Sequence, residues 1–130
     1  MDRRIYSVYA VRCSKTGRIY VGCTFDIDAR IKAHFRELAR GLKVQRTNGT
    51  NERERSQWQI DYDLYGAESF EYYILETDIP HERRIERESY WISAYKATDP
   101  ARGYNRYSQA MASNVIAYKD GTPPIPHADE

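Results

Sequence analysis

Two strand-like segments separated by a short turn constrain the fold of this chain more than any other feature. Residues 5–13, IYSVYAVRC, and residues 18–23, RIYVGC, have the apolar and aromatic patterning of strands, and SKTG lies between them. A parallel connection needs about a dozen residues or more, so these strands must pair as an antiparallel hairpin. The sequence therefore predicts an α+β protein and excludes a doubly wound parallel sheet.

The rest of the chain supplies one more strand and three helices. We predict a strand over residues 68–76, a loop over residues 41–52, and helices over residues 26–41, 52–64 and 80–97. Asn51 is expected to cap the second helix, and Pro80 to occupy the first position of the third. The expected fold is a small, three-stranded, mainly antiparallel sheet flanked by three helices.

Length and composition place these elements in one domain. A chain of 130 residues with 41% hydrophobic and 30% charged residues is typical of a single soluble domain. We expect this domain over residues 1–107, with residues 103–107 packing back onto it. The C-terminal tail, residues 108–130, is richer in Pro, Gly and small residues and is expected to be partly disordered, with residues 114–118 a candidate edge strand.

The sequence also predicts the compartment. No apolar run approaches the roughly 18 residues that span a bilayer, and the N-terminus lacks the apolar segment of a signal peptide. We therefore expect a cytoplasmic protein without membrane contact. Cys13 and Cys23 lie on the neighbouring strands of the hairpin, where a disulfide is geometrically conceivable, but thiols stay reduced in that compartment.

Charge is distributed unevenly along the chain. Residues 1–60 hold 13 Lys and Arg against 6 Asp and Glu, whereas residues 61–130 hold 7 against 13. The basic half can face a polyanion such as DNA, while the acidic half faces away from it or supplies metal ligands.

The hairpin and the first helix carry the first candidate site residues. Tyr9 and Tyr20 flank the turn, and we expect them to be pairing neighbours on one face of the sheet. In the first helix His34 shares the apolar stripe, and Arg30 lies at its side. One interpretation is an ordinary core histidine beside an arginine whose head group reaches water. The other is a site in which the Arg30 guanidinium binds phosphate oxygens.

The third helix places a carboxylate on its apolar face. Glu88 lies on the same inward stripe as Ile85, Trp91, Ile92 and Tyr95. A carboxylate in such a place is costly unless it is paired or binds a cation. The two interpretations are a buried ion pair with Arg30 and a site for a divalent metal.

These residues occur in an order that resembles the GIY-YIG nuclease domain. The likeness covers residues 5–107, and it is carried by Ser7-Val8-Tyr9, Tyr20-Val21-Gly22, Arg30, ERESYW at 86–91 and GYN at 103–105. It is closest to the nuclease domains of phage intron-encoded homing endonucleases, a class of mobile-element enzymes, which have similar first and third helices. Each motif alone is weak, but their order and spacing together make a strong signal.

The resemblance implies a divalent-metal-dependent DNA endonuclease that hydrolyses phosphodiester bonds at a single Tyr/Arg/Glu site. It implies Mg²⁺ or Mn²⁺ bound by Glu88. The catalytic residues that it implies are Tyr9, Tyr20, Arg30, His34, Glu88 and Asn105. Tyr9 is the favoured general base, and His34 is the rival for that role.

Two departures from the family pattern affect this assignment. Ser7 replaces the first motif glycine, and Lys43 stands where some homing enzymes have a functional histidine. Gly22 is expected to end its strand and let the backbone turn beside the substrate. The residues expected to contact DNA are Arg18, Gly22, Lys43, Arg46, Arg53 and Arg55.

The expected partner is DNA. Target recognition would come from the domain itself, from a homodimer or from a separate specificity subunit. The alternative function is a catalytically inactive DNA-binding or protein-interaction module with the same fold. The sequence leaves open the target, the choice between nicking and double-strand cleavage, and the biological role.

Overall fold

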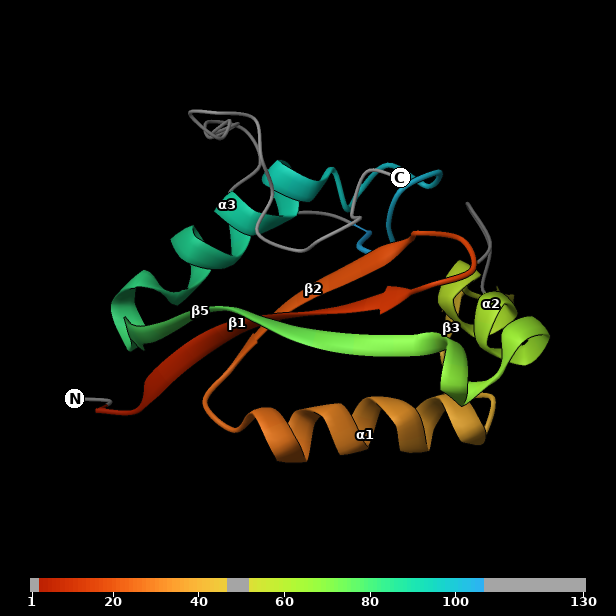
Figure 1. Ribbon diagram of the computed structural model, residues 1–130, viewed down its shortest axis with the longest axis horizontal. Helices are drawn as coiled ribbons and strands as arrows, with labels where there is room; N and C mark the ends of the chain where they lie inside the picture. Colours follow the sequence, from red (N-terminus) through yellow and green to blue (C-terminus); the bar gives the residue numbers. More distant parts are fainter. Residues whose placement is uncertain (1–2, 47–51, 107–130) are drawn as a thin grey trace.

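The computed structural model describes residues 3–46 and 52–106, which form a three-stranded sheet with helices on both faces (Figure 1). The sheet contains β1 (Ile5–Cys13), β2 (Ile19–Thr24) and β5 (Phe70–Pro80) in the order β2-β1-β5, and both pairs are antiparallel. The predicted α+β class and the hairpin are therefore confirmed. The third strand runs past the predicted residues 68–76, to Pro80.

Three α-helices surround this sheet: α1 (Ile27–Ala39), α2 (Gln57–Tyr65) and α3 (Arg84–Tyr95). Helices α1 and α3 lie on opposite faces, and α2 lies near the turn of the β1–β2 hairpin (Figure 1). Short 3₁₀ turns, η1 (Ala67–Ser69) and η2 (His81–Arg83), precede β5 and α3. No helix among the described residues is long and apolar enough to cross a membrane.

Alternation along the strands sends successive side chains into two hydrophobic clusters, one on each face. The buried cluster on the α3 side contains Val8, Ala10, Ile19, Val21, Ile79, Trp91, Ile92, Tyr95 and Ala97. The buried cluster on the α1 side contains Tyr9, Val11, Cys13, Leu38, Trp58 and Phe70. Cys13 and Cys23 pack on opposite faces and are both free thiols, so the conceivable disulfide is not formed.

The connection between α1 and α2 contains a hairpin that the sequence pattern did not predict. Strand β3 (Val44–Arg46) pairs antiparallel with β4 (Arg53–Arg55), so the predicted loop over residues 41–52 and the predicted helix start at residue 52 are wrong. Helix α2 begins at Gln57 because the Ser56 side chain accepts the Gln59 backbone N–H and caps it. Asn51, the predicted cap, lies outside the described residues.

The third helix also begins later than predicted. Pro80 ends β5 instead of starting the helix, because its φ of −67° suits extended backbone as well as a first helical turn. Ile85 therefore lies in the first turn of α3 and is 40% exposed, so its predicted place in the core is wrong. Trp91 and Ile92 are buried as predicted.

After α3 the chain returns along the outer edge of β2. Gly103 forms a parallel bridge with Ile19, and the Tyr104 N–H donates to the Ile19 carbonyl at 2.9 Å. A Cβ on Gly103 would collide with the backbone of Ala97. The expected packing of GYN is thus confirmed, whereas Tyr107 and the predicted tail, residues 108–130 with the candidate strand over 114–118, lie outside the described residues.

Candidate active site

The two motif tyrosines lie on the α1 face of the hairpin, but they are not direct pairing neighbours. Tyr9 pairs with Gly22, and Tyr20 pairs with Val11, so the phenols are diagonal neighbours with ring centroids 6.2 Å apart. Diagonal positions are still within reach of aromatic side chains. The predicted pairing is therefore wrong, while the predicted proximity of the two rings is confirmed.

Gly22 has a different function from the one expected. It does not end β2, which continues to Thr24. A Cβ on Gly22 would lie 2.6 Å from Cζ of Tyr9 and 2.9 Å from Cε2 of Tyr20, closer than real Cβ contacts allow. The missing side chain leaves room for both phenol rings across the strand pair.

The hydroxyl of Tyr9 is hydrogen-bonded to a buried histidine from α1. Nε2 of His34 lies 2.6 Å from Oη of Tyr9, and both residues are about 1% exposed. Burial, together with the positive charges of Lys43 and Arg30, lowers the pKa of His34 to about 3. The imidazole is therefore neutral at physiological pH.

Lys43, from the segment between α1 and β3, lies against the other side of this histidine. Its Nζ is 2.7 Å from Nδ1 of His34 and 2.7 Å from Oε1 of Glu37, and it lies 4.7 Å from the ring centroid of Trp58. Burial lowers the pKa of Lys43, while Glu37 acts in the opposite direction. Lys43 was predicted as a DNA contact, and the structure places it within the tyrosine–histidine cluster.

Trp58 is a residue of this site that the sequence pattern did not single out. Its ring centroid lies 4.7 Å from Tyr20 and 4.9 Å from His34, and on α2 it also stacks with Tyr104 at 5.5 Å. Trp58 is 4% exposed, and its indole Nε1–H has no hydrogen-bond partner among the described residues. No motif spacing in the sequence pointed to it.

Arg30 reaches the two phenols from the exposed side of α1. Burial raises the pKa of Tyr9 and of Tyr20, and the Arg30 guanidinium, by its charge and its hydrogen bonding, lowers both. Burial is the larger effect, so both phenols stay protonated in the free protein. A guanidinium at this position can bind a phosphate oxygen that approaches the tyrosines.

Glu88 comes from α3, on the opposite face of the sheet, and its charge also acts on the two phenols. Its half-buried carboxylate accepts a hydrogen bond from the backbone N–H of Cys23. Burial raises the pKa of Glu88, and the Cys23 hydrogen bond and the Arg84 charge oppose that rise. The negative charge of Glu88 in turn raises the pKa of Tyr9 and of Tyr20.

The ion pair between Glu88 and Arg30 that we considered is not formed. Within the described residues neither side chain has an ion-pair partner at 4.0 Å or less. The same residues contain no group of three or more His, Cys, Asp or Glu side chains that could hold a metal. A single carboxylate nevertheless suits Mg²⁺, which keeps several waters and is often bound through one carboxylate and substrate phosphates.

Asn105 pairs with the outer edge of β2. Its Oδ1 accepts the Val21 N–H at 2.8 Å, and its Nδ2 donates to the Val21 carbonyl at 2.9 Å. The outward N–H groups of this strand are thus taken in turn by the Arg102 carbonyl at Ile19, by Asn105 at Val21 and by Glu88 at Cys23. Asn105 fixes the position of the strand that carries Tyr20 and Gly22.

Where the structure describes them, the other predicted DNA contacts are exposed or bound to other partners. Arg18 binds Asp61 at 3.1 Å and the Pro100 carbonyl at 2.9 Å, and Arg55 binds Asp63 at 2.6 Å. Arg53 is exposed on β4, and the side chain of Arg46 lies outside the described structure. Arg18, Arg53 and Arg55 form no hydrogen bond or ion pair with Tyr9 or Tyr20, although Arg55 lines a cavity together with Tyr20.

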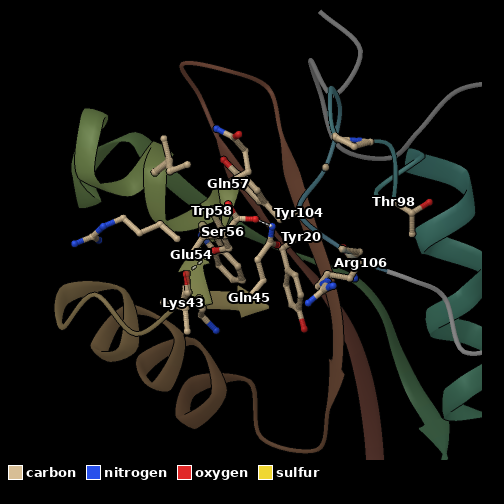
Figure 2. A pocket seen from close by; sticks show the side chains of 16 residues that line it. Tyr20, Lys43, Gln45, Glu54, Ser56, Gln57, Trp58, Thr98, Tyr104 and Arg106 are labelled. Atoms are coloured by element: carbon tan, nitrogen blue, oxygen red, sulfur yellow. Dashed lines mark hydrogen bonds between the residues drawn. The ribbon is translucent and has the colours of Figure 1, made fainter. Parts of the chain in front are cut away.

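A cavity of about 580 Å³ adjoins the cluster on the side of α2. Tyr20 and Lys43 line it next to the site, and the β3–β4 hairpin, the first half of α2 and residues 98–106 form its other walls (Figure 2). Its polar lining includes Gln45, Glu54, Ser56, Gln57, Thr98, Asn105 and Arg106. The cavity offers a mixed aromatic and hydrogen-bonding surface beside the tyrosines.

Comparisons with known proteins agree with this geometry. The GIY-YIG catalytic domain family matches residues 5–105. The chain is 31% identical over 104 residues to the intron-associated endonuclease 1 of Enterobacteria phage T4, a match that covers 75% of this chain but only 35% of that relative's length.

Two solved structures share the fold. The catalytic domain of homing endonuclease I-TevI matches with a TM-score of 0.61 and 27% identity, covering 78% of this chain and 98% of that chain. A substituted form of the same catalytic domain matches with a TM-score of 0.63 and 27% identity, covering 80% and 95% respectively.

Proposed function

Because the chain belongs to the GIY-YIG catalytic domain family, we propose that it is a DNA endonuclease whose site is formed by Tyr9, Arg30 and Glu88. One observation carries this proposal. Arg30 and Glu88 come from helices on opposite faces of the sheet, yet both shift the pKa of Tyr9 and of Tyr20. A guanidinium and a carboxylate from opposite faces therefore both lie within electrostatic reach of the two phenols.

Such a set has the functions that phosphodiester hydrolysis needs. The barrier must fall by about 20 kcal/mol, which requires a base for the water and positive charge for the phosphate. In the proposed reaction Tyr9 first loses its proton to solvent, and the phenolate then takes a proton from the attacking water. The water oxygen bonds to phosphorus, the bond to the leaving oxygen breaks, and that oxygen takes a proton from solvent. Arg30 neutralises the charge on the nonbridging oxygens.

Tyr9 is a better candidate for the base than His34. Both ring nitrogens of His34 have protein partners within 2.7 Å, so no lone pair is free to accept a proton from water. The His34 ring also packs against the rings of Tyr9 and Trp58. We therefore assign His34 to the support of Tyr9.

Glu88 is the residue that would hold a divalent cation. Its carboxylate accepts from the Cys23 N–H and has further lone pairs on its two oxygens. Mg²⁺ or Mn²⁺ bound there would add positive charge where the phosphate binds. Since one carboxylate is a weak site, the cation is expected to bind mainly together with DNA.

We propose that the DNA next to the cleaved phosphate runs over the cavity beside Tyr20. Its aromatic and amide side chains are suited to stacking and hydrogen bonding with nucleotides. A single site cuts one strand at a time, so double-strand cleavage would need a second chain or a second binding event. The targets and any specificity subunit of the whole protein are separate questions.

The test is a nicking assay on supercoiled plasmid. We expect nicked product with Mg²⁺ and none with EDTA, and Glu88→Gln should lower the rate by about a thousandfold. Glu86→Gln is the matched control, because Glu86 lies on the same helix, is 51% exposed and forms an ion pair with Arg83 at the surface. DNA binding without cleavage under every condition would favour the inactive-module alternative.

A further inference from the structure

From these contacts we infer that Lys43 is a positioning residue. By donating a hydrogen bond to Nδ1 of His34, Lys43 fixes the tautomer in which His34 donates its Nε2–H to Tyr9. This inference refines the proposed endonuclease site, and one part of its test is independent of cleavage.

The tautomer follows from counting donors. A lysine ammonium has three N–H donors and no acceptor, so Nδ1 of His34, 2.7 Å from Nζ of Lys43, must accept. A neutral imidazole that accepts at one nitrogen donates at the other. Nε2, 2.6 Å from Oη of Tyr9, therefore carries the proton, and Oη accepts it.

The neighbouring charges favour the neutral His34 that accepts at Nδ1 and donates at Nε2. A protonated His34 would bring an N–H against the Lys43 ammonium in a place that is 1% exposed, with Arg30 also near. Glu37 accepts a second bond from Lys43 at 2.7 Å, which keeps the ammonium charged. Lys43 thus donates to Glu37 and to His34, and His34 donates in turn to Tyr9.

The place of Lys43 argues against the predicted role as a DNA contact. Its side chain is 17% exposed and lies over the ring of Trp58. Two of its three donors are already used by His34 and Glu37. A lysine that binds a DNA phosphate is expected to present its ammonium to solvent instead.

This tautomer of His34 also determines where the hydroxyl hydrogen of Tyr9 points. Because Oη accepts from His34, its own O–H must point away from the imidazole. Arg30 also bonds to this hydroxyl, so two donors stabilise the phenolate once the proton leaves. The opposite tautomer of His34 would accept the Tyr9 proton and hold the phenol in its neutral form.

The direct test is nuclear magnetic resonance of protein labelled with ¹⁵N at histidine. The chain has 3 histidines, and the spectrum of His34→Gln identifies the His34 signals. We expect His34 to carry its proton on Nε2 alone in the full chain at neutral pH. In Lys43→Met this preference should be lost, and in Lys43→Arg, which keeps a donor, it should be kept at least in part.

The functional test separates catalysis from binding. Single-turnover cleavage at saturating DNA and Mg²⁺ should fall roughly tenfold to hundredfold in Lys43→Met, with the Kd for DNA within about twofold of the parent. Lys32→Met, an exposed lysine on α1, is the matched control and should change neither quantity.

Several results would overturn the inference. One is a His34 that is protonated on Nδ1 in the parent protein, a measurement that stands even if Lys43→Met does not fold. Another is a Lys43→Met variant with normal single-turnover rate, weaker DNA binding and a salt slope reduced by about one, as for a phosphate contact. If the parent cuts no DNA, the proposed function fails, while the tautomer still decides the role of Lys43.

Discussion

The two faces of the sheet contribute to the candidate site in different ways. On the α1 face, Tyr9 and His34 are buried and already joined at 2.6 Å, and Lys43 continues the contacts at 2.7 Å. On the α3 face, an apolar cluster packs against β1 and β2. Among the described residues, Glu88 is the one candidate site residue on that face. The residues that we propose to handle the proton are already in contact in the free protein, whereas Glu88 is proposed to act only once a cation and DNA are bound.

The position of β2 at the edge of the sheet explains how both faces reach one site. In the order β2-β1-β5, β2 is an edge strand. Only at an edge can side chains from the α1 face and from the α3 face contact the same ligand without the sheet between them. Arg30 and Glu88 can therefore meet a ligand beside Gly22. Tyr9 is on the central strand β1 and contributes from the α1 face alone.

Among substitutions on the α1 face, Tyr9→Phe should have the largest effect on the rate of cleavage. This substitution removes the hydroxyl that accepts from His34 and serves as the base, and we expect single-turnover cleavage to fall roughly a hundredfold to ten-thousandfold. Tyr72→Phe on β5, which is 47% exposed, is the control and should cleave normally. A normal rate of cleavage for Tyr9→Phe would show that Tyr9 is not the base.

The pH dependence of cleavage sharpens the same test. Burial raises the pKa of Tyr9 above its usual value near 10, so the phenolate fraction, and with it the rate, should rise about tenfold per pH unit between about pH 6 and pH 9. His34, with a pKa of about 3, is deprotonated throughout that range. A flat profile, measured under single-turnover conditions with saturating Mg²⁺, would therefore favour His34.

A smaller effect is expected from Gly22→Ala. The new Cβ would collide with both phenol rings, and we expect it to lower the free energy of unfolding by about 1–3 kcal/mol and to reduce cleavage. Denaturant unfolding measures the change. In a Tyr9→Leu background, which lacks the phenol, the same substitution should cost less, and an equal cost in both backgrounds would mean that Gly22 does not serve Tyr9.

The smallest effect on cleavage is expected from Asn105→Ala. Loss of two hydrogen bonds to Val21 should lower the free energy of unfolding by about 1–3 kcal/mol, with less than about a tenfold loss of rate. Asn105→Asp, which keeps the acceptor, should be intermediate in stability. A loss of more than a hundredfold at unchanged stability would assign Asn105 a direct catalytic role, as the family resemblance implied.

Much of the fold could be predicted because its signals are local. The hairpin follows from a turn too short for a crossover, and α1 follows from an apolar stripe that begins after Asp26, whose side chain caps it. The β3–β4 hairpin could not be predicted, because RER at residues 53–55 has no apolar alternation. Pro80 misled the prediction because one φ value serves both a strand end and a helix start.

Only those residues of the candidate site that belong to the ordered sequence motifs could be predicted. Tyr9, Tyr20, Arg30 and Glu88 were identified from motifs, and the structure brings them together. The contact of Lys43 with His34 could not be found, because it depends on where the chain turns after α1. The only sequence signal was the spacing of His34 and Glu37, which places both on one side of that helix.

The hydrogen bonds along β2 have a consequence for self-association. An open outer strand is a template on which another chain can add a strand, and such pairing leads to aggregation. Here the Arg102 carbonyl, the Asn105 amide and the Glu88 carboxylate occupy three successive outward donors of β2. By accepting from Cys23, the carboxylate that we propose for the cation site also leaves one backbone donor fewer for a strand of another chain at this edge.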